Sequence, residues 1–153
     1  MDVKGKNVFI TGSTRGIGKA MALAFAKAGA NIILNGRGEI PKEKIEEIEA
    51  FGVKCVGVSG DISDYEKAGQ MIKEAEEKLG SIHVLVNNAG ITNDKLVMRM
   101  DAEDFKKCLD INLIGTFNMT QHVLKKMMKQ REGAIINPVS YTHLRAHETK
   151  ANL

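Results

Sequence analysis

The sequence has no tryptophan, only two prolines and two cysteines. Cys55 and Cys108 lie far apart and form no CxxC motif, which is typical of buried thiols in a reducing cytoplasm rather than of a disulfide framework. No apolar run approaches the length of a membrane span, and the charged N-terminus is unlike a signal peptide. The formal net charge of +3 is too small to indicate nucleic acid or a membrane as a partner. We therefore expect a cytoplasmic globular protein.

Glycine, with 15 residues, is plentiful, and a chain of 153 residues with 43% apolar content can bury a core. Short apolar runs alternate with amphipathic segments, and this alternation predicts strands at 6–11, 31–35, 54–58, 83–87 and 134–137. Helices are expected between them at 16–28, 41–51, 63–79 and 101–131, with Ser63 as an N-cap and a bend near Gly115. The pattern predicts an α/β fold, a Rossmann-type doubly wound parallel sheet in the order 3-2-1-4-5. Its fifth strand would be a bare edge, and the sheet incomplete on that side.

A glycine-rich loop, TGSTRGIG at 11–18, follows the first predicted strand and opens the first helix. Gly12 permits a sharp turn, Gly16 lets a pyrophosphate approach the backbone, and Gly18 allows close packing of the helix on the sheet. The helix N-terminus then presents free N–H groups to the phosphates. The alternative is a glycine-rich turn without a ligand.

The end of the second predicted strand indicates which dinucleotide is preferred. An NAD site usually has an acid there, but this chain reads Asn35, Gly36 and Arg37. Arg37 and Arg15 could both pair with a ribose 2′-phosphate, so we expect NADP(H). Glu39 is the nearby acid that would favour NAD instead, and both arginines could simply face solvent.

Four motifs together resemble the short-chain dehydrogenase/reductase family: the GxxxGxG loop, Asp61-Ile62 after the third strand, NNAG at 87–90, and Asn112 within DINL. The segment 87–100, NNAGITNDKLVMRM, is most similar to the 3-oxoacyl-[acyl-carrier-protein] reductase branch of that family. The resemblance covers about residues 3–137. It implies that the cofactor-binding residues are Gly12, Ser13, Arg15, Gly16, Ile17, Gly18, Arg37, Asp61, Ile62, Asn88, Ala89 and Gly90. The alternatives are structural: Asp61 could cap the following loop, and the two asparagines could satisfy backbone groups.

The resemblance also implies catalytic roles. Asn112 would help to hold a water of the proton relay, and Ser140 falls by count on the serine that stabilises the reacting carbonyl. The family's tyrosine donates a proton, with its pKa lowered by a lysine four residues later. In this chain Tyr141 follows Ser140 too closely, and Arg145 stands where the lysine would be.

The end of the sequence departs from the family pattern at Pro138. We therefore expect residues 1–137 to be a partial NADP-binding domain, and residues 138–153 to be a foreign, disordered tail of the kind that a frameshift or a joined sequence would produce. His143 and His147 lie four apart but lack a third ligand, so no metal site is expected.

The resemblance implies reduction of 3-oxoacyl-[acyl-carrier-protein] in fatty acid biosynthesis, with an acyl carrier protein thioester as partner and a homotetramer for full-length members. Lys125, Lys126, Lys129 and Arg131 could meet the acidic carrier, or merely complement a helix C-terminus. We expect this chain to express poorly and to lack turnover. The alternatives are a non-catalytic NADP(H)-binding module and a short-chain reductase of other ketones.

Overall fold

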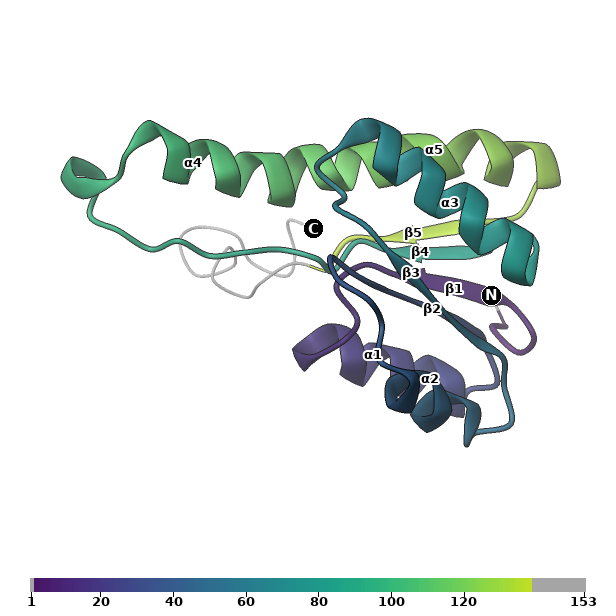
Figure 1. Ribbon diagram of the computed structural model, residues 1–153. Helices are drawn as coiled ribbons and strands as arrows, with labels where there is room; N and C mark the ends of the chain where they lie inside the picture. Colours follow the sequence, from purple (N-terminus) through teal and green to yellow (C-terminus); the bar gives the residue numbers. More distant parts are fainter. Residues whose placement is uncertain (1, 139–153) are drawn as a thin grey trace, which may run out of the picture.

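The computed structural model describes residues 2–138, which form a parallel sheet with helices on both faces (Figure 1). The strands are β1 Asn7–Ile10, β2 Asn31–Gly36, β3 Cys55–Ser59, β4 Val84–Val86 and β5 Ala134–Ile136. Their order is β3-β2-β1-β4-β5, and every neighbouring pair is parallel. The predicted fold class and strand order are therefore confirmed. In the described residues β5 pairs only with β4 and forms one edge of the sheet.

The strands are apolar throughout because each is covered on both faces. All four residues of β1 are buried. Val8 and Ile10 belong to one apolar cluster and Phe9 to the other, as the alternation of side chains along a strand requires.

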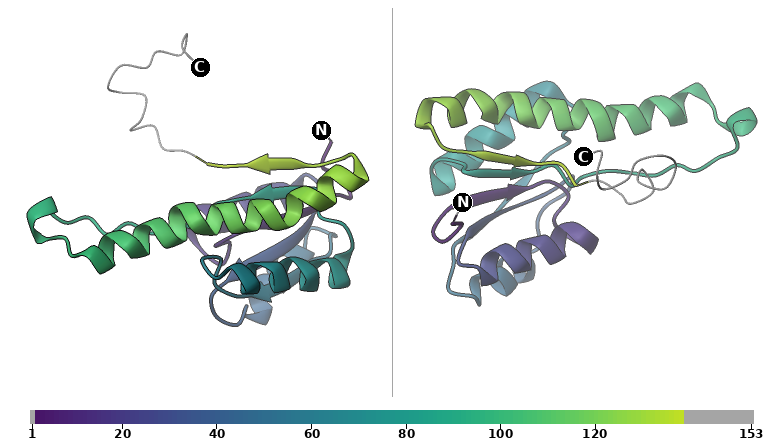
Figure 2. Two further views of the ribbon diagram at one scale, coloured as in Figure 1. Left: turned by 90° about the horizontal axis from the view of Figure 1, so that it is seen from above. Right: turned by 180° about the vertical axis from the view of Figure 1, so that it is seen from behind.

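The helices divide between the two faces (Figures 1 and 2). On one face lie α1 Gly16–Lys27 and α2 Lys42–Glu49, and on the other α3 Tyr65–Leu79, α4 Ala102–Leu109 and α5 Gly115–Gln130. The core on the second face comes mainly from α3 and α5, for example Met71, Ile72, Met119 and Val123. Every residue of α4 remains at least partly exposed, and its first turn extends beyond the sheet.

The start of α3 differs from the prediction. The N-cap is Asp64, whose side chain accepts a hydrogen bond from the backbone N–H of Lys67, so the prediction of Ser63 as the cap is wrong. The hydroxyl of Ser63 instead donates to Oδ1 of Asp61 at 2.7 Å. Serine and aspartate are both favourable N-caps. Because the hydroxyl of Ser63 donates to Asp61, Asp64 serves as the cap.

The segment predicted as one helix over 101–131 contains an irregular turn. A π-helical turn, Asp110–Ile114, separates α4 from α5 directly before Gly115, the position where we expected a bend. Before α4, a 3₁₀ turn spans Val97–Arg99. None of the helices in the described part of the chain is both long and apolar enough to cross a bilayer.

Candidate nucleotide-binding site

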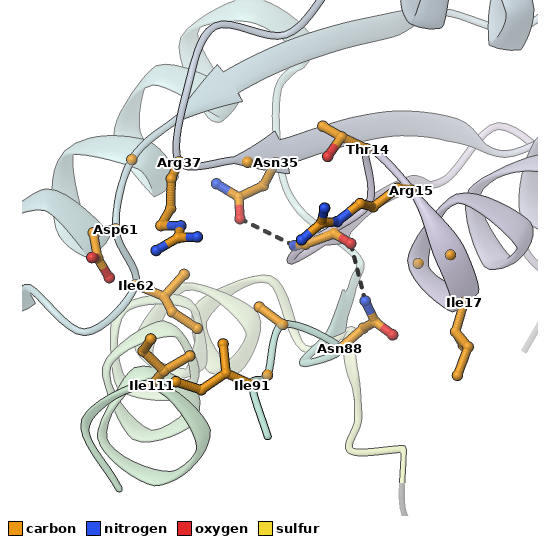
Figure 3. Close-up of a pocket in the computed structure, with 17 residues that line it drawn as sticks. Thr14, Arg15, Ile17, Asn35, Arg37, Asp61, Ile62, Asn88, Ile91 and Ile111 are labelled. Carbon is orange, nitrogen blue, oxygen red and sulfur yellow. Dashed lines mark hydrogen bonds between the residues drawn. The ribbon is translucent and has the colours of Figure 1, made fainter. Parts of the chain in front are cut away.

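A cavity of about 330 Å³ lies at the carboxyl ends of the central strands, where parallel α/β sheets bind their ligands (Figure 3). Its walls come from the loop after β1, the end of β2, and the segments that follow β3 and β4. All the predicted cofactor-binding residues except Ser13 line it. The structure thus brings the glycine loop, the residues at the end of β2, the Asp61-Ile62 pair and the NNAG segment to one cavity.

The glycine loop leaves space where a ligand would need it. Gly12 and Gly16 have φ of +62° and +56°, a left-handed conformation that side chains disfavour. A Cβ on Gly16 would meet no atom within 4 Å, so the backbone there borders open space. A Cβ on Gly18 would lie only 2.4 Å from the carbonyl oxygen of Gly12, so this glycine is needed for packing. Gly16 therefore leaves room for a ligand, whereas Gly18 holds the loop against the helix.

The N-terminus of α1 points into this space. Arg15 occupies the N-cap position, but within residues 2–138 its side chain makes no capping hydrogen bond, and the first turn carries no acid. The first N–H groups of a helix then remain available, and the helix dipole is positive at this end. Such an end fits a pyrophosphate.

Ser13 lies beneath the loop rather than on the cavity wall. Its hydroxyl donates to the carbonyl of Ile10 at 2.7 Å and accepts from the N–H of Asn35 at 2.9 Å. The side chain of Asn35 in turn accepts from the N–H of Gly12 at 3.3 Å and donates to the carbonyl of Val58 at 3.2 Å. Asn35 is only 2% exposed. These two polar side chains fix the loop to β1, β2 and β3 from inside the protein.

Asn88 fixes the other side of the loop. Its amide donates to the carbonyls of Thr11 and Gly12 at 3.0 and 3.2 Å (Figure 3 shows the second bond). The N–H of Ala89 donates to the hydroxyl of Thr11 at 2.9 Å. The segment after β4 is therefore tied to the loop after β1, and both border the same cavity.

The positive charge at the cavity comes from Arg15 and Arg37 (Figure 3). None of the ion pairs formed within residues 2–138 involves either guanidinium. Glu39, the acid that would have favoured NAD, is exposed and is not part of the wall of this cavity. Gly36, the last residue of β2, lines the cavity without a side chain.

Asp61 both lines the cavity and holds its own loop. Its Oδ1 accepts from the N–H and the hydroxyl of Ser63 at 2.9 and 2.7 Å, so the structural alternative for Asp61 is realised. Ile62, Ile91 and Ile111 lie along the same side of the cavity in Figure 3 and give it an apolar surface that suits a base.

Asn112 lies in the π-helical turn and borders a second, wider hollow of about 1020 Å³ next to the cavity. Its Oδ1 accepts from the N–H of Ile91 at 2.8 Å, and its amide donates to the carbonyl of Ile91 at 2.9 Å. Its own carbonyl accepts from the hydroxyl of Thr116 at 3.0 Å. Both polar groups of this side chain are engaged within the protein, where they hold the turn against the segment after β4.

Asn87 lines the same hollow. Its amide donates to the hydroxyl of Thr120 at 3.1 Å and to Oδ1 of Asn137 at 2.8 Å. Its buried Oδ1 has no hydrogen-bond partner among residues 2–138. The predicted catalytic residue Ser140 lies outside the described residues, as do Tyr141, His143, Arg145 and His147. In the part that is described, no three His, Cys, Asp or Glu side chains are placed to hold a metal ion.

Several cavity residues were not predicted from the sequence: Thr14, Asn35, Gly36, Gly60, Ile91 and Ile111. Most of them are direct neighbours of predicted residues, so their proximity to a motif in the sequence could have identified them as cavity residues. Ile91 directly follows the NNAG segment, and Ile111 precedes Asn112.

Comparison with known proteins identifies the family. A sequence model of the short chain dehydrogenases matches residues 6–150. The chain belongs to this family. Members bind NAD(H) or NADP(H) and act as oxidoreductases, and the free helix end, the open backbone at Gly16 and the apolar wall fit such a dinucleotide.

The individual relatives are more specific. The chain is 40% identical to a 3-oxoacyl-[acyl-carrier-protein] reductase of Staphylococcus epidermidis over 149 residues, which are 96% of this chain and 61% of that protein. It is 45% identical to the reductase of the same name from Aquifex aeolicus, over 90% of this chain and 57% of that protein. A crystal structure described as a short-chain alcohol dehydrogenase from Sinorhizobium meliloti superposes with a TM-score of 0.89 at 32% identity, with 99% of this chain and 60% of that one covered. The chain thus spans about three fifths of the length of these relatives.

Proposed function

We propose that this short-chain dehydrogenase is the nucleotide-binding part of an NADPH-dependent 3-oxoacyl-[acyl-carrier-protein] reductase of fatty acid biosynthesis. Such an enzyme reduces the 3-oxo group of a carrier-bound acyl thioester to a 3-hydroxy group. The names of the relatives from Staphylococcus epidermidis and Aquifex aeolicus support this substrate. The cytoplasm, where a soluble carrier protein would meet it, is the proposed location.

The observation that carries the cofactor preference is the pair of cavity arginines, neither of which has a carboxylate partner among residues 2–138. Arg15 lines the cavity from the loop before α1 and Arg37 from the end of β2, where Gly36 contributes no side chain. A guanidinium fits a phosphate with two parallel hydrogen bonds. Asp61, the acid that lines this cavity, follows β3 and not β2, and its Oδ1 accepts two hydrogen bonds from Ser63. We therefore assign the 2′-phosphate of NADP(H) to this end of the cavity.

The other predicted residues that line the cavity are assigned to the remaining parts of the dinucleotide. Asp61 and Ile62 would flank the adenine, the N-terminus of α1 would bind the pyrophosphate, and Asn88, Ala89 and Gly90 would border the nicotinamide side. When bound, the cofactor supplies the hydride. Asn112 holds the wall of the adjoining hollow, and Ser140 is proposed to stabilise the substrate carbonyl in the family's active form.

We further propose that the chain in its present form binds NADP(H) without turnover. The described residues contain the nucleotide cavity, but the sequence lacks the Tyr-x-x-x-Lys pair after Ser140. Residues 138–153 are proposed not to continue the family's fold. This proposal distinguishes the chain from a complete reductase, whether that reductase acts on carrier-bound thioesters or on other ketones.

The long helical segment suggests how the full-length protein assembles. Large apolar side chains are exposed along it at intervals of mostly four residues: Phe105, Leu109, Leu113, Phe117, Leu124 and Met128. A monomer rarely exposes such a stripe. We propose that it is a self-association surface of the homotetramer formed by full-length members, and that Lys125, Lys129 and Arg131 beside it face the acidic carrier.

Isothermal titration calorimetry tests the cofactor assignment directly. The purified chain should bind NADP⁺ at least about tenfold more tightly than NAD⁺, since one charge-assisted phosphate contact is worth about 1.5–3 kcal/mol. Arg37→Ala should reduce this preference and leave NAD⁺ affinity unchanged, while Arg15 remains at the cavity. Equal affinity of the wild-type chain for the two nucleotides would exclude the NADP assignment.

A second assay tests catalysis. NADPH absorbance is followed with a 3-oxoacyl thioester, both for this chain and for a version in which residues 138–153 are replaced by the corresponding C-terminal part of the Aquifex aeolicus relative. We expect turnover only in the second protein. Turnover by the chain as it stands would contradict the proposed inactivity, and nucleotide binding without turnover in both would favour the non-catalytic module.

A further inference from the structure

A second hollow, of about 440 Å³, adjoins the adenine end of the nucleotide cavity. Arg37, Asp61 and Ile111 line both of them, so the two spaces adjoin at these residues. The far wall of this hollow is formed by α4 and includes Lys106 and Lys107. A helix that has no role in the sequence motifs therefore borders the site where we place the phosphate-bearing ribose.

The register of the helical segment sets which side chains face this hollow. Residues four apart lie on the same helical face, so Glu103, Lys107 and Ile111 form one line along it. All three line the hollow, and Ile111 also lines the nucleotide cavity, so Lys107 lies about one turn before a residue of the cavity wall.

The position of α4 is fixed by contacts outside this line. Lys95 forms an ion pair with Asp104, and Asn112 holds both backbone groups of Ile91. The hydrogen bond from Lys95, and secondarily the hydrogen bond from Asn93, lowers the pKa of Asp104. The main chain that carries Lys107 is thus tied at both ends to the segment after β4.

The charges in the hollow are not equally available to a ligand. Lys106 is neutralised by Asp110 at 2.6 Å, Asp104 by Lys95, and Asp61 accepts two hydrogen bonds from Ser63. Within residues 2–138 Lys107 takes part in no ion pair, although Glu103 lies four residues before it. Among residues 2–138, the ion pairs leave Lys107 and Arg37 as the cations of this hollow without a carboxylate partner, and Glu103 as an acid of the hollow without a cationic one.

We infer that Lys107 is a specificity-determining residue that strengthens binding of the phosphorylated dinucleotide by adding positive charge beside Arg37. An ammonium on a four-carbon stem can follow a phosphate without the fixed geometry of a guanidinium. A dianionic phosphate within a Debye length, about 8–10 Å, is attracted even without direct contact. This inference rests on the proposed NADP(H) function.

The test compares nucleotide affinities of three variants by calorimetry at low ionic strength. Lys107→Glu reverses the charge, Lys107→Arg keeps it, and Lys73→Glu makes the same charge reversal on the exposed face of α3, away from the hollow. We expect Lys107→Glu to weaken NADP⁺ binding about tenfold, because the reversal replaces a modest attraction for the 2′-phosphate with a modest repulsion. NAD⁺ lacks this phosphate, so its binding should weaken less than about twofold. Lys107→Arg and Lys73→Glu should bind like the wild-type chain, and raising the salt concentration should reduce the effect of Lys107→Glu.

Each other outcome contradicts the inference in a distinguishable way. If the wild-type chain binds neither nucleotide, the proposed function fails, and the role of Lys107 fails with it. If NADP⁺ is preferred but Lys107→Glu leaves the preference intact, only the role of Lys107 is wrong. If Lys107→Glu weakens the binding of both nucleotides equally, the lysine acts on the shared adenosine and not on the 2′-phosphate. If Lys73→Glu weakens NADP⁺ binding as much as Lys107→Glu does, the effect comes from the net charge of the protein and not from the position of Lys107.

Discussion

Replacing Gly18 by alanine should destabilise the whole domain, although only one methyl group is added. The new Cβ would lie 2.4 Å from the carbonyl oxygen of Gly12, 2.5 Å from the amide nitrogen of Asn88 and 2.9 Å from Cα of Ser13. Two of these three atoms belong to the backbone, so the contact cannot be relieved by rotating a side chain. The α1 helix must therefore move away from the glycine loop, and the side chain of Asn88 must also leave its position.

The cost can be estimated from what is lost. Overpacking of a dense interior costs about 1–3 kcal/mol. If Asn88 moves, its bonds to the carbonyls of Thr11 and Gly12 break, at about 1 kcal/mol each. A total of about 3–5 kcal/mol is expected, which is a large part of the free energy of unfolding of an ordinary domain, about 5–15 kcal/mol.

Urea denaturation followed by circular dichroism measures this loss, and two other glycines provide controls. A Cβ on Gly38 would meet no atom within 4 Å, so Gly38→Ala should change stability by less than about 0.5 kcal/mol. Gly16→Ala has equal space but φ of +56°, so it should cost about 1–2 kcal/mol and weaken nucleotide binding. With an m-value of about 2 kcal/mol per M, Gly18→Ala should lower the urea midpoint by about 1.5–2.5 M. A midpoint shift no larger than that of Gly38→Ala would refute the packing role of Gly18.

Three further predictions concern charge and reactivity. Gly36→Asp should reverse the nucleotide preference in calorimetry, because a carboxylate at the end of β2 accepts from a ribose 2′-OH and repels a 2′-phosphate; an unchanged preference would count against the assigned phosphate site. Burial, and secondarily a nearby glutamate, raises the pKa of Cys55 to about 12, so a thiol reagent at pH 8 should label Cys108 fast and Cys55 only upon unfolding; two fast thiols in the native chain would show that β3 is open. The backbone N–H of Lys67 lowers the pKa of Asp64, so the stability from this carboxylate is present above its unfolded pKa and is lost as the pH falls through its folded pKa. The stability difference between the wild type and Asp64→Ala should therefore shrink in acid urea titrations, and a constant difference would contradict this linkage.

The sheet was predictable because burial on both faces leaves a strong sequence signal. Runs such as FIT at 9–11 and NIILN at 31–35 contain few residues that tolerate water, and right-handed crossovers then allow few strand orders. The cap of α3 was less predictable because Ser63 and Asp64 are both good N-caps. The choice between them depends on Asp61, whose carboxylate accepts the hydroxyl of Ser63.

Residues that line the cavity were predictable where they belong to local motifs at the ends of the strands. Features that depend on contacts between distant segments were missed. The π-helical turn at 110–114 is held by Asn112 on Ile91, a contact across 21 residues that no local propensity signals. Asn35 and Gly36 illustrate the role of register. Both residues border the cavity, but the side chain of Asn35 bonds to the glycine loop and to β3, whereas Gly36 contributes only backbone. Neighbouring residues on a strand point to opposite faces, and a shift of one position would have exchanged their roles.

The ties from Asn88 and Ala89 to Thr11 and Gly12 have a kinetic and entropic consequence. A binding loop that is already held from below by Asn35 and from the side by Asn88 need not be ordered by its ligand, so little affinity is lost to freezing the backbone. In such a preorganised site the backbone changes little when the ligand binds or leaves. Both ends of an elongated ligand then contact one rigid unit of the protein.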